Sequence, residues 1–348
     1  MRNKFPFLNI LFPALLFYSC HINEGSVCVC QSGNWIHRAK FNGILRSGAC
    51  AFIIGDNVYI CGGYASSTSV TLQDCWRYNV STDSWAQEAD MKGGARSSAI
   101  GFNIGNKGFV GIGFNGNQLL QDFWQYDPST NTWTQRSQFP AGGRMEAVGF
   151  SILDKGYIAT GTDMLSNFKD LWEYDTTRNS WIKSADLPGT QRSAAAFWVY
   201  RNKAYIVTGQ NADSAVNDFW IFDPNVPDNE SWRKLRSISN ATAETFDDGY
   251  TNISRWNTAS FIIQNTAVGD RGYITTGENH TLYTFTWEYD FATDLWRELT
   301  PLEAPARTGA LGFSADNRGF IFGGRDDNKE SFPEIFEFHP DEVVNSND

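Results

Sequence analysis

The chain has 348 residues, and its 28 basic and 39 acidic side chains give a net charge of −11 at neutral pH. This acidic balance argues against a nucleic-acid partner, because phosphate binding needs a clustered basic surface. Aromatic residues make up 15% of the chain and there are 31 glycines. That composition favours short, half-buried strands joined by tight turns over helices.

The N-terminal residues 1–19 have the character of an export signal. Arg2 and Lys4 precede the mostly apolar stretch 5–18, which is too short and too interrupted by proline to make a good membrane span. The stretch ends at Cys20 in a sequence that resembles a bacterial lipobox, in which this cysteine is acylated and becomes the first mature residue. An ordinary secretory signal cut nearby is the alternative. Both predict export, to the bacterial periplasm or the outer-membrane surface. The lipoprotein alternative adds membrane contact through the lipid anchor at Cys20 only.

Residues 20–32 are expected to form a short tether. The remaining cysteines all lie in the first quarter of the chain, and an export compartment permits disulfides. The spacing of the cysteines does not indicate which of them form disulfides. Cys28 and Cys30 are the closest two in the sequence, and they lack the second Cys/His pair that a zinc site needs. Buried single thiols or one local bridge are expected among Cys28, Cys30, Cys50, Cys61 and Cys75.

A repeated unit then organises the chain, and its clearest copy runs from Arg96 to Trp133. An arginine opens each copy, aromatic residues follow six and thirteen positions later, and a glycine follows seventeen positions later. The fifth copy carries a five-residue insertion near 265–270 in this first half. Turn-forming residues separate short apolar runs, which predicts four strands per copy. The opening arginines are Arg46, Arg96, Arg144, Arg192, Arg255 and Arg307.

Tryptophans mark the second half of each unit, and eleven of the thirteen tryptophans occupy two repeat positions. Four strands in a unit of about 48 to 50 residues predict the blades of a β-propeller. The two tryptophan positions fall on the outer strands, where large aromatic side chains can fill the wedge between neighbouring blades.

Six copies predict six blades and a particular closure of the ring. The sixth copy lacks its second tryptophan, whereas Trp35 precedes Arg46 by the eleven residues found between the same positions in other copies. We therefore expect Asn34–Lys40 to supply the outer strand of the sixth blade, which leaves no free sheet edge. The propeller is expected to span residues 33–340, with a tail at 341–348.

The glycine-rich end of the second strand, as in Cys61-Gly62-Gly63, with the spaced tyrosine and tryptophan after it, resembles the kelch signature. The resemblance covers essentially residues 33–340. Two copies keep the double glycine, and the others resemble divergent bacterial kelch proteins. This resemblance implies an all-β, six-bladed propeller with four antiparallel strands per blade, and by itself it says little about function.

One face of this propeller is expected to carry a ligand site. The loop leading into the first strand and the loop joining the second and third strands lie on the same face, so the opening arginines would surround one mouth of the channel. A fan of guanidinium groups suits carboxylates. Alternatively, the arginines brace their loops by binding carbonyl groups or an acid such as Asp122. The predicted ligand-binding residues are the six arginines with Asn115, Asp163, Asn211 and Arg325.

Departures from the repeat are further candidates. The longest lies between Trp232 and Arg255, where residues 239–252 form a polar insertion in a mouth-side loop. Long loops on rigid scaffolds commonly carry recognition, although a surface insertion is also tolerated at little cost. Glu244 in this loop and Glu278 near the fifth glycine are the candidate catalytic carboxylates.

Two functions remain open from the sequence. The first is a monomeric binding module for a glycan, peptide or protein, which needs no cofactor, metal or catalytic constellation. The second follows from a resemblance to the six-bladed periplasmic sialic-acid mutarotases. It implies an isomerase acting on an acidic sugar such as N-acetylneuraminate. The candidates in this chain are Glu278 or Glu244 for acid–base catalysis and Arg255 or Arg307 for clamping the carboxylate. With only four histidines, the chain cannot build the copper centre of the kelch-containing galactose oxidases.

Overall fold

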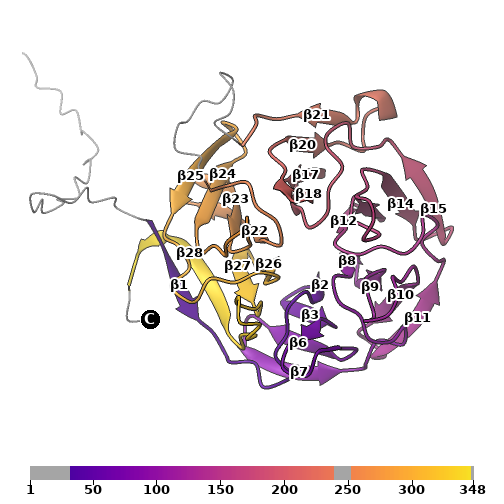
Figure 1. Ribbon diagram of the computed structural model, residues 1–348, viewed down its shortest axis with the longest axis horizontal. Helices are drawn as coiled ribbons and strands as arrows, with labels where there is room; N and C mark the ends of the chain where they lie inside the picture. Colours follow the sequence, from indigo (N-terminus) through magenta and orange to yellow (C-terminus); the bar gives the residue numbers. More distant parts are fainter. Residues whose placement is uncertain (1–31, 239–251, 346–348) are drawn as a thin grey trace, which may run out of the picture.

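A computed structural model describes residues 32–238 and 252–345, and Figure 1 shows these residues as a ring of blades around a central axis. Each blade is one antiparallel sheet of four strands, with its first strand nearest the axis. Strands one to four of the first three blades are β2 (Cys50–Ile54), β3 (Asn57–Cys61), β6 (Cys75–Asn79) and β7 (Ser84–Glu88); β8 (Ile100–Ile104), β9 (Lys107–Gly111), β10 (Phe123–Asp127) and β11 (Thr132–Arg136); β12 (Val148–Ile152), β13 (Lys155–Ala159), β14 (Leu171–Asp175) and β15 (Ser180–Ser184).

The other three blades repeat this order, and the fifth has the longest first hairpin because of its insertion. Short two-residue hairpins and one 3₁₀ turn complete the described part of the chain. The strands are β16 (Ala196–Tyr200), β17 (Lys203–Val207), β20 (Phe219–Phe222) and β21 (Trp232–Lys234); β22 (Ala259–Thr266), β23 (Gly269–Thr275), β24 (Thr286–Asp290) and β25 (Leu295–Leu299); β26 (Leu311–Ala315), β27 (Arg318–Phe322), β28 (Ile335–Val343) and β1 (Ser32–His37). The small elements are β4 (Tyr64–Ala65), β5 (Val70–Thr71), β18 (Gln210–Asn211), β19 (Ser214–Ala215) and η1 (Asp228–Glu230).

The sixth blade closes the ring in the predicted way. β1 from the N-terminal end pairs antiparallel with β28 from the C-terminal end, so that the indigo and yellow strands lie side by side in Figure 1. The predicted limits of the propeller were slightly too narrow, since β28 continues to Val343 and Asn345 donates its backbone N–H to the side chain of Asn34. The first residues of the predicted tail, 341–343, therefore belong to β28, because this strand continues along its partner β1.

The closing sheet also holds a buried ionic cluster centred on Glu337. Its carboxylate accepts hydrogen bonds from Arg38 Nε at 2.6 Å and Arg318 Nε at 2.7 Å, and His339 Nε2 lies 3.1 Å away. Burial would raise the pKa of Glu337, but the bonds from His339 and Arg318 and the charges of the arginines lower it to about 2. The carboxylate thus stays ionised and links β28 to both neighbouring strands.

The apolar core lies between adjacent blades rather than inside any one of them. Phe52 on β2 stacks on Tyr59 with ring centroids 4.9 Å apart, and it also contacts Tyr126 and Trp133 of the next blade at 5.7 and 6.2 Å. The tryptophan on the fourth strand also contacts the preceding blade. In blade two, Trp133 Nε1 donates to the carbonyl of Ala89 at 2.9 Å, directly after the first blade. The predicted wedge-filling role of these aromatic side chains is confirmed.

One disulfide, Cys61–Cys75, joins directly opposite residues of β3 and β6. Cys50 on the adjacent β2 is a buried free thiol. The expectation of one local bridge is met among the described cysteines, while Cys20, Cys28 and Cys30 lie outside the described residues.

Candidate functional site

The mouth is the face on which the loop leading into each blade meets the loop after that blade's second strand. The pairing is direct, because the residue after each opening arginine forms a β-bridge with the residue after the glycine, as in Ser97–Phe114 and Thr308–Arg325. The two loop sets predicted to share a face are therefore in contact.

The opening arginines do not line this mouth. All six are buried, with 0–1% of each residue exposed. Arg96 donates to both carboxylate oxygens of Asp122 at 2.9 and 2.8 Å and to the carbonyl of Ile112 at 3.2 Å. The same ion pair joins Arg46 to Asp74, Arg144 to Asp170 and Arg192 to Asp218.

The prediction that these arginines form a ligand-binding fan is therefore wrong for this structure, and the bracing alternative describes them. Blades five and six keep the arginine but not the ion pair: blade five has Phe285 at the position of the acid, and blade six has Glu334 there, which makes no ion pair with Arg307. Arg255 and Arg307 make no ion pair within the described residues and bind carbonyl groups instead. Burial lowers the pKa of Arg255 to about 9 and that of Arg307 to about 10, since little opposite charge compensates the lost hydration.

The repeated glycine has a structural reason. Gly113 has φ +98°, and a Cβ added there would lie 2.7 Å from the carbonyl oxygen of Ser97. Its own N–H donates at 2.8 Å to the carbonyl of Arg144 in the next blade, and the equivalent bond recurs around the ring to Gly324 and Arg46. The glycine therefore fastens each blade to the next.

Two of the predicted polar ligands shape their own loops, and a third bonds to the loop of the preceding blade. Asn115 Oδ1 accepts the backbone N–H groups of Asn117 and Gln118, both at 2.9 Å. Asp163 accepts two backbone N–H groups in the same type of turn, and these bonds lower its pKa. The Asn211 side chain receives a hydrogen bond from Asn167 at 3.3 Å.

A closed ring of backbone hydrogen bonds, here called the collar, surrounds the channel just inside the mouth. Each member stands two residues after an opening arginine, donates its N–H to the member in the preceding blade and has φ between +50° and +64°. The donor–acceptor distances run from 2.8 to 3.2 Å. The six members are Gly48, Ser98, Glu146, Ala194, Asn257 and Gly309.

At the position directly after the repeated glycine, only blades five and six carry a charged residue. Glu278 and Arg325 occupy the position directly after the glycine, where the other blades have Tyr64, Phe114, Thr162 and Gln210. Glu278 Oε1 accepts from Thr308 Oγ1 at 2.7 Å and from the collar residue Asn257 at 3.1 Å. Arg325 is half-buried and makes no ion pair with the described residues. The mouth thus combines a positioned carboxylate with an uncommitted guanidinium group.

Glu146 is the mouth residue that sequence reasoning missed. Burial raises its pKa, a hydrogen bond with Ser193 opposes this shift, and the nearby negative charge of Glu278 adds to it. The sequence alone could have identified Glu146 as unusual, because the collar position holds glycine, serine, alanine or asparagine in every other copy.

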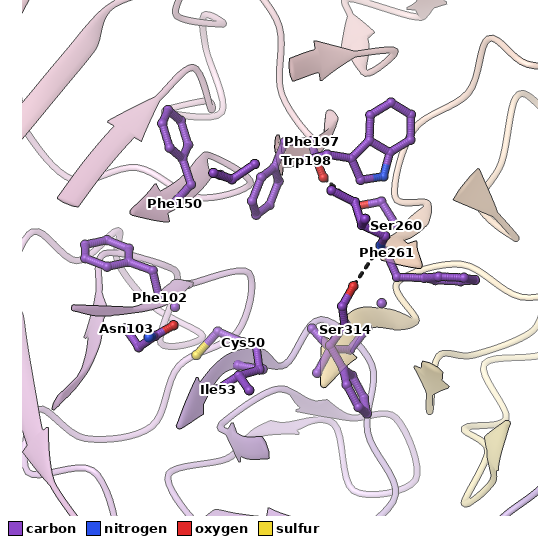
Figure 2. Close-up of a pocket in the computed structure, with 18 of the residues that line it drawn as sticks. Cys50, Ile53, Phe102, Asn103, Phe150, Phe197, Trp198, Ser260, Phe261 and Ser314 are labelled. Carbon is purple, nitrogen blue, oxygen red and sulfur yellow. Dashed lines mark hydrogen bonds between the residues drawn. The ribbon is translucent and has the colours of Figure 1, made fainter. Parts of the chain in front are cut away.

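The channel inside the collar widens into an axial cavity of about 640 Å³ between the six inner strands. Figure 2 shows Phe197 directed into this space, while Phe102, Phe150 and Trp198 point away from it into the blades. A smaller cavity of about 170 Å³ lies within the collar and shares Phe197 as a lining residue.

Glu244 lies outside the described residues, as does nearly all of the insertion at 239–252. Over 32–238 and 252–345, no cluster of three or more histidine, cysteine, aspartate or glutamate side chains is placed to hold a metal ion. No helix in those ranges is long and apolar enough to cross a membrane.

Comparisons with known proteins agree with this architecture. The Kelch motif matches residues 45–92 and 113–140. Kelch-like protein 21 from Homo sapiens is 39% identical over 62 residues, and that from Rattus norvegicus is 37% identical over 62 residues; each match covers 18% of this chain and 10% of the relative. The matched stretch thus spans about a tenth of each relative's length.

A solved structure titled "Structure of YjhT" superposes with a TM-score of 0.70 over 85% of this chain and 95% of that chain, at 16% identity. At that identity the likeness concerns the fold. With the blade count, the strand order and the matched motifs, the chain is an all-β, six-bladed β-propeller that carries kelch motifs.

Proposed function

We propose that the protein is an exported binding module whose mouth recognises a polar, hydroxyl-bearing ligand such as a glycan, or a peptide or protein that presents similar groups. The main support for this proposal is that the residue directly after the repeated glycine is charged in two blades and uncharged in the other four. Four blades place uncharged side chains there, whereas blades five and six place Glu278 and Arg325. A carboxylate already oriented by Thr308 and Asn257 can accept hydrogen bonds from hydroxyl groups, and the guanidinium group of Arg325, which makes no ion pair with the described residues, can donate two parallel hydrogen bonds.

Binding to a glycan array and to pulled-down partners is expected to depend on Arg325. Replacing Arg325 by alanine should weaken binding about tenfold or more, because a hydrogen bond to a charged group contributes roughly 1.5–3 kcal/mol. Arg201→Ala is the matched control, since that side chain is 77% exposed and lies at the turn between strands one and two of blade four, on the opposite face. Equal binding by both variants and the unchanged protein would contradict a site at this mouth.

A second candidate is an isomerase of the sugar-mutarotase type, and the pair Glu146–Glu278 specifically favours it. Anomer interconversion needs a group that can donate a proton and one that can accept it near the anomeric carbon. The raised pKa of Glu146 keeps its carboxyl protonated to higher pH than an ordinary glutamate. Arg325, rather than the buried opening arginines, would hold the carboxylate of an acidic sugar.

Freshly dissolved α-anomer of N-acetylneuraminate, followed by NMR, tests the isomerase. Acceleration should decline as pH rises through the raised pKa of Glu146, because the proton donor is then lost. Glu146→Gln should abolish the acceleration, whereas Glu173→Gln, at a half-buried carboxylate on strand three of blade three, should not. A rate equal to that of buffer removes this candidate and leaves the binding proposal standing.

Export and a lipid anchor at Cys20 remain part of the proposal. The Cys61–Cys75 disulfide supports the export component, because such bonds persist chiefly in oxidising compartments.

A further inference from the structure

The axial cavity is a candidate for a second site, distinct from the mouth. Its volume of about 640 Å³ lies in the range of small-molecule pockets. Its rim includes Asp316 and Asn317, at the turn between β26 and β27, and Gln264, near the end of β22 that leads into the matching turn of blade five. These turns are at the opposite end of the inner strands from the mouth, so the cavity is reached from the other face of the ring.

Phe197 breaks the pattern of the inner strands at the centre of the molecule. The position five residues after the opening arginine carries only alanine, glycine or serine in the other blades: Ala51, Gly101, Gly149, Ser260 and Gly312. Those small residues let adjacent inner strands approach closely, as a Cβ on Gly101 would lie 2.4 Å from the carbonyl oxygen of Ala51. Phe197 is half-buried, and Figure 2 shows its ring directed into the cavity. Its ring also packs against the core, with its centroid 6.2 Å from that of Phe150, but the small residues of the other blades show that the repeat does not require an aromatic side chain here.

The remaining lining suits an uncharged molecule with hydroxyl groups. Seven residues after the arginine, three blades place Asn103, Ser151 and Ser314 toward the axis, and the other three place isoleucine or valine there. Ser314 Oγ accepts the N–H of Ile262 at 2.7 Å, which leaves its own proton to donate. The Asn103 amide has only a weak 3.4 Å bond to the carbonyl of Gly105.

Ionised groups are absent from the described interior of this cavity. Asp316 is the one carboxylate in the lining, and it is exposed at the rim. Burial raises the pKa of the Cys50 thiol to about 12, so this side chain is neutral as well. A charged ligand would lose its hydration here without compensation.

The collar separates this space from the mouth. Six backbone hydrogen bonds close the channel down to the small cavity of about 170 Å³, and Phe197 lies where the two cavities meet. From these observations we propose that the axial cavity binds a small uncharged ligand that presents an apolar ring face to Phe197 and hydroxyl groups to Asn103, Ser151 and Ser314.

The test uses 4-fluorobenzyl alcohol as a probe and 4-fluorobenzoate as its charged counterpart, each titrated into the mature protein and followed by ¹⁹F NMR. The alcohol should bind saturably and the benzoate should bind about tenfold more weakly or not at all. Ser151→Phe, which fills the cavity, and Phe197→Ala, which removes the ring face, should each weaken binding of the alcohol about tenfold. Denaturant unfolding of both variants establishes that they remain folded.

Two controls separate this site from the mouth. Ser129→Phe, at an exposed turn of the second blade, and Arg325→Ala, at the mouth, should leave binding of the alcohol unchanged. Loss of binding in Arg325→Ala would assign the probe to the mouth and overturn the proposal. So would undiminished binding in folded Ser151→Phe, equal binding of the benzoate, or no saturable binding of the alcohol at millimolar concentration.

Discussion

Replacing Trp35 by alanine is expected to lower the free energy of unfolding by about 3–5 kcal/mol, the usual cost of removing a buried tryptophan. Only 2% of this residue is exposed, and its ring lies 4.6 Å from that of Phe338 and 6.1 Å from that of Phe261. Its Nε1 donates to the carbonyl of Thr300 in the fifth blade. The loss should be measured by denaturant unfolding.

The position of Trp35 makes this substitution more consequential than the same change inside a continuous blade. β1 is attached to its sheet only through β28, so weakening it exposes an unpaired strand edge. We expect Trp35→Ala to form dimers or larger species on size-exclusion chromatography, whereas Trp133→Ala in the second blade should be destabilised yet monomeric. A loss below about 1 kcal/mol for Trp35→Ala would contradict the closure described here.

The second large effect is expected at an arginine–aspartate brace. Asp122→Ala leaves the guanidinium group of Arg96 buried without its counter-charge, and breaking a buried pair in this way costs about 3–5 kcal/mol. The Asp122 side chain is 23% exposed, which places the expected loss near the lower end of that range. Unfolding in urea measures it.

An exposed ion pair provides the comparison. Lys183 and Asp186 lie 3.1 Å apart with 53% and 41% of their side chains exposed, so Asp186→Ala should change stability by no more than about 1 kcal/mol. Similar losses for Asp122→Ala and Asp186→Ala would mean that the braces add little, and the repeated arginines would then need another explanation.

The fold could be predicted from the sequence because repetition multiplies weak local signals. A single arginine, aromatic residue or glycine indicates little, but six copies in register identify the strands. The offset of Trp35 even located the closing strand. The limits of that strand were less accurate, since the pairing of Val343 with Ser32 depends on a partner distant in the chain.

The candidate site was harder to predict for the same reason. The arginines were prominent because they recur in every copy, but they recur because they stabilise each blade from a buried position and not because they bind a ligand. Glu146 and Phe197 escaped notice because each lies in a column of small residues, where one unusual member does not disturb the pattern. Comparing the six copies position by position, rather than seeking what they share, would have found both. No pattern indicated that Asn115 and Asp163 would turn their side chains back onto their own loops.

The collar has a consequence for how such a molecule can change its specificity. Its bonds use only peptide groups, and each member both gives and receives one bond, so no side chain takes part in them. The positive φ of each member disfavours β-branched residues but admits several unbranched ones. Glycine, serine, glutamate, alanine and asparagine already coexist in it. The backbone of the pore rim can therefore keep its shape while the side chains on it differ, and a new ligand preference can arise by single substitutions, among residues that accept a positive φ, without rebuilding the ring.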